Sequence, residues 1–136
     1  MKYLLDTNVV SALMKGDPVV LRRLSSVARA DVAVPQPVFA EIAYGIERLP
    51  PSRRRDTLRE IFERLRSELT PVAWSSAVTD AFGHIKATLE AQGQRIEDFD
   101  AAIAAHALAS GAVLITANLQ HMARVPELRV ESWTSG

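Results

Sequence analysis

The 136-residue chain contains no cysteine. Disulfide bonds, thiolate metal sites and a cysteine nucleophile are therefore excluded, and any metal site must use oxygen or imidazole ligands. The chain also has no net charge, because 16 Lys and Arg residues balance 16 Asp and Glu residues. No overall field then attracts nucleic acid or an anionic membrane, so a phosphate-bearing partner must meet a local basic patch.

A long apolar segment is missing as well. Only three apolar residues separate Lys2 from Asp6, which is too few for a signal peptide. Residues 101–123 contain no Asp, Glu, Lys or Arg, but polar side chains interrupt this stretch. We therefore expect a buried helix, a stop at Gly111 and a buried strand there instead of a membrane span. These absences predict a cytoplasmic protein without a membrane partner.

Short apolar runs alternate with longer segments of helical character. The strand candidates are KYLL (2–5), AVLI (112–115) and, more weakly, DVAV (31–34) and PVA (71–73). The helix candidates are 38–49, 58–69, a segment from Ser75 or Ser76 toward Gly93, and 98–110. This alternation predicts right-handed crossovers and a mostly parallel sheet between helical layers, which is an α/β fold. The length fits one domain that spans residues 1–136.

Several polar residues lie close to the predicted strand ends. Asp6 directly follows the first strand, and Thr116 and Asn118 follow the AVLI strand. Glu41 lies in the first half of the helix after DVAV, and the helix at 98–110 opens with two aspartates. The carboxyl ends of parallel strands meet at one edge of a sheet, so we expect these side chains to share one crevice.

Each acid also has a structural explanation. A carboxylate in or just before the first helical turn binds free backbone amides, which would explain Asp98 and Asp6 without any chemistry. Asn8 is nevertheless the better cap candidate in its own segment. Glu41 lies beside the apolar stripe of its helix, where a solvated glutamate is the default, and Asp100 has a similar standing.

The acids are more informative as a group. Three neighbouring carboxylates repel one another and shift toward protonation unless a cation compensates for their charge. Oxygen ligands without cysteine favour Mg²⁺ or Mn²⁺ over zinc. A water held by such an ion can attack a phosphodiester, so the group predicts a metal-dependent nuclease.

Four segments together resemble a known family, the PIN-domain ribonucleases, and specifically the VapC toxins of bacterial toxin–antitoxin pairs. They are LLDTNVVSAL (4–13), VFAEIAYGIERL (38–49), DFDAAIAAHAL (98–108) and VLITANLQHMARVPELRVESW (113–133). The resemblance implies an α/β/α sandwich with about five mostly parallel strands. It also implies an Mg²⁺- or Mn²⁺-dependent endoribonuclease, a cognate VapB-type antitoxin and a homodimer, with the helices at 38–49 and 58–69 as expected contact surfaces.

The resemblance assigns roles to individual residues. Asp6, Glu41 and Asp100 match the core acids of the family, which implies that they bind metal directly or through water. The expected supporting residues are Thr7, Asn8, Thr116 and Asn118, and Asn118 stands where some members carry a fourth aspartate. Asp98 is an additional acid that either helps to bind metal or caps its helix.

Two departures from the family pattern are visible. Ala117 stands where many relatives have a basic or amide residue, and His121-Met122 stands where many have an acidic residue followed by an aromatic one. Both leave the three core acids intact. GQRIEDFDAAIAAHALASG (93–111) and RVPELRVESW (124–133) look closest to members that cut initiator tRNA in the anticodon stem-loop, and we take that substrate as a hypothesis.

The segment PSRRRDTLREIFERLR (51–66) contains six arginines. A solvated helix with pairs such as Glu60 and Arg64 accounts for the distal ones. No run of acids balances Arg53, Arg54 and Arg55, so we expect these three to contact RNA phosphates or an acidic partner.

Two other function classes stay open from sequence. A phospho-accepting signalling domain would share the small α/β fold, the early aspartate and a Thr-Ala pair such as Thr116-Ala117. It also needs a lysine near the last strand, whereas the only lysines are Lys2, Lys15 and Lys86. A PIN fold that binds RNA or protein without cutting is the other alternative.

Overall fold

The structure is a computed structural model, and it describes residues 1–134. Its five strands form one parallel sheet in the order β3-β2-β1-β4-β5. Their bounds are β1 Tyr3–Leu5, β2 Val32–Pro35, β3 Thr70–Val72, β4 Val113–Ile115 and β5 Val130–Glu131. The central strand β1 pairs with β2 through Tyr3 and Val32 and with β4 through Tyr3 and Val113. The predicted parallel sheet is therefore confirmed.

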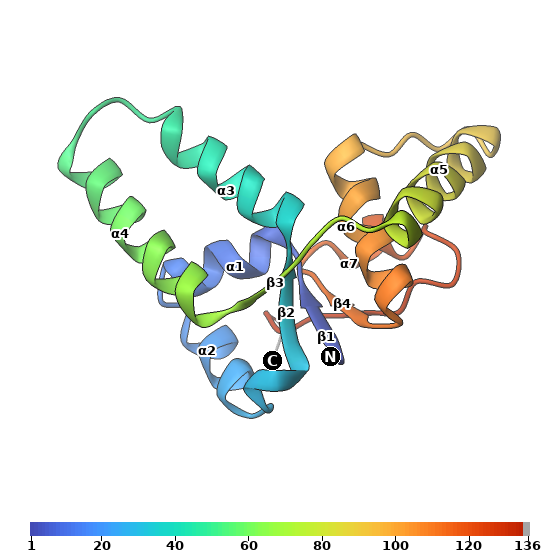
Figure 1. Cartoon of the computed structure of the whole chain (residues 1–136). Coiled ribbons are helices and arrows are strands. Elements are labelled where there is room, and N and C mark those ends of the chain that lie inside the picture. Colours follow the sequence, from blue (N-terminus) through green and yellow to red (C-terminus); the bar gives the residue numbers. More distant parts are fainter. Residues whose placement is uncertain (135–136) are drawn as a thin grey trace.

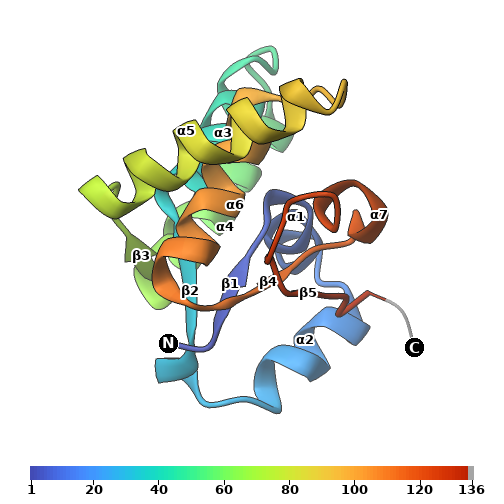
Figure 2. The ribbon, with the colours of Figure 1, turned by 90° about the vertical axis from the view of Figure 1, so that its right-hand side faces the viewer.

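Helices cover both faces of the sheet (Figure 1). One layer contains α1 (Thr7–Met14), α2 (Pro18–Ser25), α3 (Gln36–Glu47) and α4 (Arg53–Glu68). The other layer contains α5 (Ser76–Ala91), α6 (Asp98–Ser110) and the short α7 (Leu119–Met122). The 3-10 turn η1 (Arg29–Asp31) leads into β2. The arrangement is the expected α/β/α sandwich, and α5 lies across α6 in the turned view (Figure 2).

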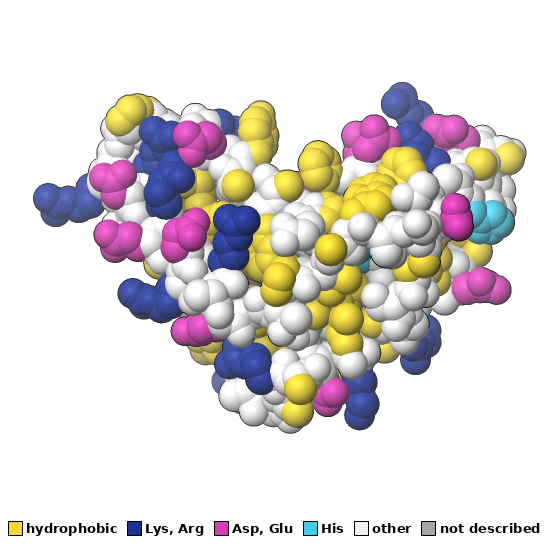
Figure 3. Space-filling view, viewed as in Figure 1, with side chains coloured by type: hydrophobic (Ala, Val, Ile, Leu, Met, Phe, Trp, Pro, Cys, Tyr) yellow, Lys and Arg dark blue, Asp and Glu magenta, His cyan; other side chains and the backbone are white. Residues whose placement is uncertain are grey.

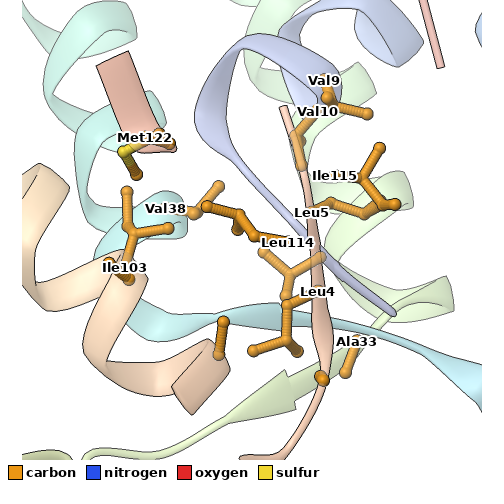
Figure 4. Close-up of a cluster of buried hydrophobic side chains, with 14 of the residues drawn as sticks. Leu4, Leu5, Val9, Val10, Ala33, Val38, Ile103, Leu114, Ile115 and Met122 are labelled. Atoms are coloured by element: carbon orange, nitrogen blue, oxygen red, sulfur yellow. The ribbon is translucent and has the colours of Figure 1, made fainter. Parts of the chain in front are cut away.

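The core lies where the central strands meet both helical layers (Figure 4). Leu4, Leu5, Leu114 and Ile115 are completely buried, because β1 and β4 have helices on both faces. Seven consecutive residues of α6, from Ala101 to Ala107, are buried, so this helix is enclosed on all sides over about two turns. Gly111 ends α6 in the left-handed conformation, with φ of 64°, which a glycine adopts without a steric penalty.

The elements missing from the sequence candidates include α2, the short α7 and β5. Helix α2 begins at Pro18 behind the capping side chain of Asp17, and only Val20 and Leu24 of its eight residues are buried. Strand β5 has two residues, which is too short for a recognisable apolar run. The expected domain of residues 1–136 includes two C-terminal residues that lie outside the described part of the chain. Among residues 1–134, no helix is long and apolar enough to cross a membrane.

Candidate active site

Asp6 lies at the carboxyl end of β1, and its side chain is fixed on both sides. Its Oδ1 accepts a hydrogen bond of 2.7 Å from the backbone N–H of Thr7, and its Oδ2 accepts one of 2.8 Å from the Thr116 hydroxyl. The residue is only 4% exposed. The expectation that Asn8 caps this helix is wrong, because α1 begins at Thr7 and Asp6 occupies the cap position with extended backbone.

Asn8 and Thr116 join the loops that follow β1 and β4. Asn8 Oδ1 accepts from the backbone N–H of Ala117 at 2.9 Å, and its Nδ2 donates to Asp6 Oδ2 and Thr116 Oγ1, each at 3.4 Å. Thr116 Oγ1 also accepts from the backbone N–H of Asn118 at 3.0 Å. A hydroxyl has one donor and two acceptor sites. These three hydrogen bonds use the whole capacity of the Thr116 hydroxyl, and its one proton is donated to Asp6 Oδ2.

Glu41 reaches the same place from α3. Its Oε1 accepts a short hydrogen bond of 2.6 Å from the Thr7 hydroxyl, which comes from the first turn of α1. Thr7 thus connects the two carboxylates, with its backbone N–H on Asp6 and its hydroxyl on Glu41. Glu41 is partly exposed, so one side of its carboxylate faces solvent.

Asp100 completes the group from the first turn of α6. It lines a cavity of about 420 Å³ together with Glu41, Glu97, Asp98 and Phe99. The space-filling view shows a notch between the α3–α4 arm and the α5–α6 end of the molecule (Figure 3). The charges of Asp6, Glu41 and Asp100 interact, so β1, α3 and α6 bring these acids together at one edge of the sheet; Glu41 and Asp100 line the cavity, whereas Asp6 is almost fully buried.

The electrostatics of the group are unfavourable for negative charge. Burial raises the pKa of Asp6, the Thr116 and Thr7 hydrogen bonds oppose this, and the charge of Asp100 raises the pKa further. Burial also raises the pKa of Glu41, the Thr7 hydrogen bond lowers it, and Asp100 and Asp6 raise it again. Within residues 1–134, no lysine or arginine forms an ion pair with any of these three acids. The one ionisable partner of the group among these residues is His121, whose Nε2 lies 3.0 Å from Asp100 Oδ2, so no permanently charged side chain balances the three acids there.

The donor set suits a hard divalent cation held partly through water. In the described part of the chain, no group of three acidic or histidine side chains is close enough together to coordinate a metal ion directly. Mg²⁺ usually keeps several waters and takes only one or two carboxylates from the protein, so it needs no closed cage. A carboxylate offers about four acceptor sites, and Asp6 uses three of them within the protein. The oxygens of Asp6, Glu41 and Asp100 therefore fit such an ion.

The remaining predicted site residues have different surroundings. Asp98 lies on the rim of the cavity, where its exposed carboxylate forms an ion pair of 2.5 Å with Lys86. Asn118 is exposed at the start of α7, and its side chain makes no capping hydrogen bond. The site also includes His121, whose Nε2 lies 3.0 Å from Asp100 Oδ2. Sequence reasoning noted His121 only as a departure and missed both this contact and that of Lys86, because each joins elements distant in the chain.

The arginine segment forms the start of α4, and its Arg54 lines another cavity that Thr7 and Glu41 also line. Arg53 and Arg54 are exposed, as expected. The expectation that no acid balances Arg55 is wrong: its guanidinium pairs at 2.8 Å with Glu47, which also pairs with Arg59 at 2.6 Å. Glu47 lies on α3, and the two helices pack side by side, so an acid from the preceding helix supplies the balance that the local sequence lacks. The ion pair along α4 joins Glu63 and Arg66, at 3.9 Å, instead of Glu60 and Arg64.

Comparisons with known proteins agree with this geometry. Residues 3–128 match the family model of the PIN domain. Ribonuclease VapC2 of Haemophilus influenzae is 37% identical over 134 residues, which are 98% of each chain. The tRNA(fMet)-specific endonuclease VapC of Shigella flexneri is 28% identical over 98% of this chain and 99% of its own. The solved structure of VapBC2 from Rickettsia felis bound to a promoter DNA fragment contains a chain with a TM-score of 0.88 and 28% identity, over 98% of this chain and 99% of that one.

Proposed function

The chain belongs to the PIN-domain family and, within it, to the VapC ribonucleases, and we propose that it is the toxin of a toxin–antitoxin pair that hydrolyses RNA phosphodiester bonds at Asp6, Glu41 and Asp100. The observation that carries this proposal is a group of three carboxylates at one edge of the sheet, none of which is paired with a lysine or arginine within residues 1–134. A structural role would favour an arginine or lysine partner, as Glu47 has. Carboxylates without a lysine or arginine partner instead favour a bound cation, which in turn favours an anionic substrate.

The three acids would hold Mg²⁺ or Mn²⁺, with Asp98 and Asn118 as candidates for further contacts through water. When bound, such an ion supplies positive charge to the phosphodiester and makes a neighbouring water a stronger acid. The protein's own contribution is rigidity. Thr7 and Thr116 hold the two oxygens of Asp6 by hydrogen bonds, and Thr7 also holds Glu41. These two carboxylates are therefore preorganised in the absence of substrate.

The substrate class is RNA, and initiator tRNA is the specific candidate. The Shigella flexneri relative and a Salmonella typhimurium relative are named as tRNA(fMet)-specific endonucleases, and each is aligned over 98% of this chain. The exposed residues Arg53 and Arg54 are candidates to bind RNA phosphates, and Arg54 lines the same cavity as Glu41. Because RNA lies in the cytoplasm, we place the activity there. A cleavage profile in which rRNA or another tRNA is cut before initiator tRNA would reject the specific substrate.

A groove beside the acids offers a site for the antitoxin. A cavity of about 330 Å³ lies among α1, α3 and α4, and Thr7 and Glu41 are at its edge. Its other lining residues include five large apolar side chains and three basic ones; the apolar residues are Met14, Ile42, Ile46, Leu49 and Leu58, and the basic ones are Lys15, Arg48 and Arg54. The Rickettsia felis structure is a VapBC complex, and we propose that an apolar segment of a VapB-type antitoxin occupies this groove and blocks the acids.

An exposed apolar surface supports the expected homodimer. Trp74 and Phe99 are 48% and 47% exposed, and they line a second cavity of about 180 Å³ with Pro37 and Phe82. Hydrophobic side chains are visible over the centre of the face shown in Figure 3. Exposed aromatic clusters of this kind mark association sites. Light scattering of the purified chain should give the mass of a dimer, and a monomer would contradict this part of the proposal.

Cleavage of labelled RNA tests the function itself. We expect the antitoxin-free protein to cut a mixture of tRNA and rRNA with Mg²⁺ or Mn²⁺, and to stop cutting when EDTA is added or Asp6 is changed to Asn. The Asp80→Asn variant is the matched control, because Asp80 is an exposed aspartate on α5 and does not line the cavity. A metal-loaded, folded protein that cuts no RNA would favour the alternative of a PIN fold that only binds. A phospho-accepting domain finds no support in the family match.

A further inference from the structure

His121 and Arg124 form a connected pair that ends on the Asp100 carboxylate. His121 Nε2 lies 3.0 Å from Asp100 Oδ2, and His121 Nδ1 lies 3.0 Å from Arg124 Nη2. Arg124 is itself held by the backbone, because its Nε donates to the His121 carbonyl and its Nη2 donates to the Arg95 carbonyl, each at 3.0 Å. A series of hydrogen bonds thus runs from the Arg95 carbonyl through Arg124 and His121 to Asp100 Oδ2.

The chemistry of the guanidinium fixes the direction of every hydrogen bond in this path. Arg124 can only donate, so Nδ1 of His121 must be the acceptor. The ring proton therefore resides on Nε2, which donates to Asp100 Oδ2. In this state both ring nitrogens of His121 are occupied, so the imidazole has no free lone pair for a metal or for taking a proton from water.

The position of the ring is also rigid. His121 lies on α7, whose neighbouring residue Met122 is buried in the core beside Val38 and Ile103 (Figure 4). The His121 and Asp100 side chains are only 28% and 30% exposed. The other oxygen of Asp100, Oδ1, accepts no hydrogen bond from residues 1–134, so it is left available to the crevice.

We propose that His121, oriented by Arg124, is the positioning residue of Asp100, holding Oδ2 through its Nε2 proton so that Oδ1 faces the cation and the RNA. His121 thus places a hydrogen-bond donor beside Asp100 at a position where many sequences of the family pattern carry an acidic residue. The kinetic part of this inference rests on the proposed ribonuclease function, whereas the arrangement of the proton does not.

The first test is the tautomer of His121 in the metal-free protein. A long-range ¹H–¹⁵N correlation spectrum, recorded at a pH where the spectrum itself shows the ring to be neutral, should show its proton on Nε2. In the Arg124→Met variant the Nδ1 acceptor loses its donor, and both tautomers should become populated. A wild-type ring with its proton on Nδ1, or a spectrum that Arg124→Met leaves unchanged, would overturn the proposal without involving RNA or metal.

The second test compares two substitutions of His121. Gln retains an N–H for Asp100 and a carbonyl oxygen for Arg124, whereas Leu provides neither. We expect His121→Leu to weaken Mn²⁺ binding, measured by calorimetry, and to lower kcat for RNA, each by roughly 10- to 100-fold, as is usual for groups that orient a metal ligand. His121→Gln should recover most of both losses, with KM little changed throughout.

The two variants also separate positioning from folding. Thermal unfolding should show similar stability for both, because the side chain is partly exposed. Equal losses of Mn²⁺ affinity in Gln and Leu variants, or no loss in either, would contradict the positioning role. A wild-type protein that binds Mn²⁺ but cuts no RNA would contradict the proposed function instead, and the tautomer and Mn²⁺ measurements would still decide the role of His121.

Discussion

Two glutamates on the same helix, Glu41 and Glu47, have opposite surroundings. Glu47 is exposed, and the guanidinium groups of Arg59 and Arg55 lower the pKa of its carboxyl. Glu41 is half-buried, and burial with the charges of Asp100 and Asp6 raises the pKa of its carboxyl despite the hydrogen bond from Thr7. The chain could place a cation on Glu41, since Arg54 lines the same groove, but the described structure forms no such ion pair.

We interpret Glu47 as an acid that is paired within the fold, and Glu41 as an acid of the proposed site. An ion pair such as Glu47 with Arg55 needs nothing further, and an exposed pair contributes little to stability. A buried carboxylate without a cation costs free energy of folding and is retained only where another partner supplies the charge. We therefore use the absence of a Lys or Arg partner, together with burial, as the reason to place Glu41 and not Glu47 in the proposed site.

The largest expected effect comes from exchanging the two glutamates separately for glutamine. Glu41→Gln should lower the rate of RNA cleavage by roughly 100- to 1,000-fold, the usual scale for removing one group that stabilises charge in a transition state. Glu47→Gln is the matched control and should leave the rate unchanged. Initial rates on a labelled tRNA at saturating Mg²⁺ would measure both, and similar rates for the two variants would break the comparison.

A smaller effect is expected at Thr7, which connects Glu41 to Asp6. Thr7→Val keeps the shape and the backbone N–H on Asp6 but removes the 2.6 Å hydrogen bond to Glu41. That bond lowers the pKa of Glu41, so its loss should raise this pKa further. Carboxyl ¹³C titration of the metal-free protein would show the shift, and cleavage should fall by roughly tenfold, which is the scale of one net hydrogen bond of about 1.4 kcal/mol. An unchanged or lowered Glu41 pKa would argue against the assigned contact.

Asp6→Asn should change how the free energy of unfolding depends on pH. The folded-state pKa of Asp6 is raised above its ordinary value of 3.8, so the native state binds more protons than the unfolded state between these two values. The free energy of unfolding then falls as pH rises through the folded-state pKa. In metal-free protein, urea unfolding should show the variant gaining stability relative to the wild type over this rise. A variant that loses stability at high pH relative to low pH would contradict the sign.

The smallest effect concerns Glu47, whose pKa is lowered. The stability that its ion pairs provide is present above the ordinary value of 4.5 and is lost as pH falls through the folded-state pKa. Glu47→Gln should therefore be slightly less stable than the wild type at neutral pH, with the difference vanishing in acid and in high salt. Thermal unfolding at several pH values would measure it, and a difference that grows on acidification would count against the pairing.

Sequence predicts the architecture because buried parallel strands are continuous apolar runs. KYLL and AVLI appear as β1 and β4, and the helix signals around Ser75 and Gly111 match the ends of α5 and α6. Strand β5 has only two residues and is defined by pairing with β4, so no local pattern reveals it. The position of Asp6 as the cap of α1 depends on where the strand ends, which apolar spacing does not fix to one residue.

The site was predictable in its acids and less so in the contacts that orient them. Asp6, Glu41 and Asp100 follow from the strand-end rule and from the family motifs. The Thr7–Glu41 hydrogen bond and the His121–Asp100 contact join residues 34 and 21 positions apart, so they depend on side-chain geometry. The same holds for Arg55, whose partner Glu47 lies on the neighbouring helix.

The central claim is that a divalent cation binds at Asp6, Glu41 and Asp100, which have no lysine or arginine partner within residues 1–134, and not at an ion-paired acid such as Glu47. Paramagnetic line broadening by Mn²⁺ in the isotope-labelled, metal-free protein tests it most directly. We predict that broadening begins around Asp6, Glu41 and Asp100, that Glu47→Gln leaves this pattern unchanged, and that Glu41→Gln requires much more Mn²⁺ to produce it. Broadening that begins around Glu47, or that spreads over the surface without a centre at the crevice, would contradict the account.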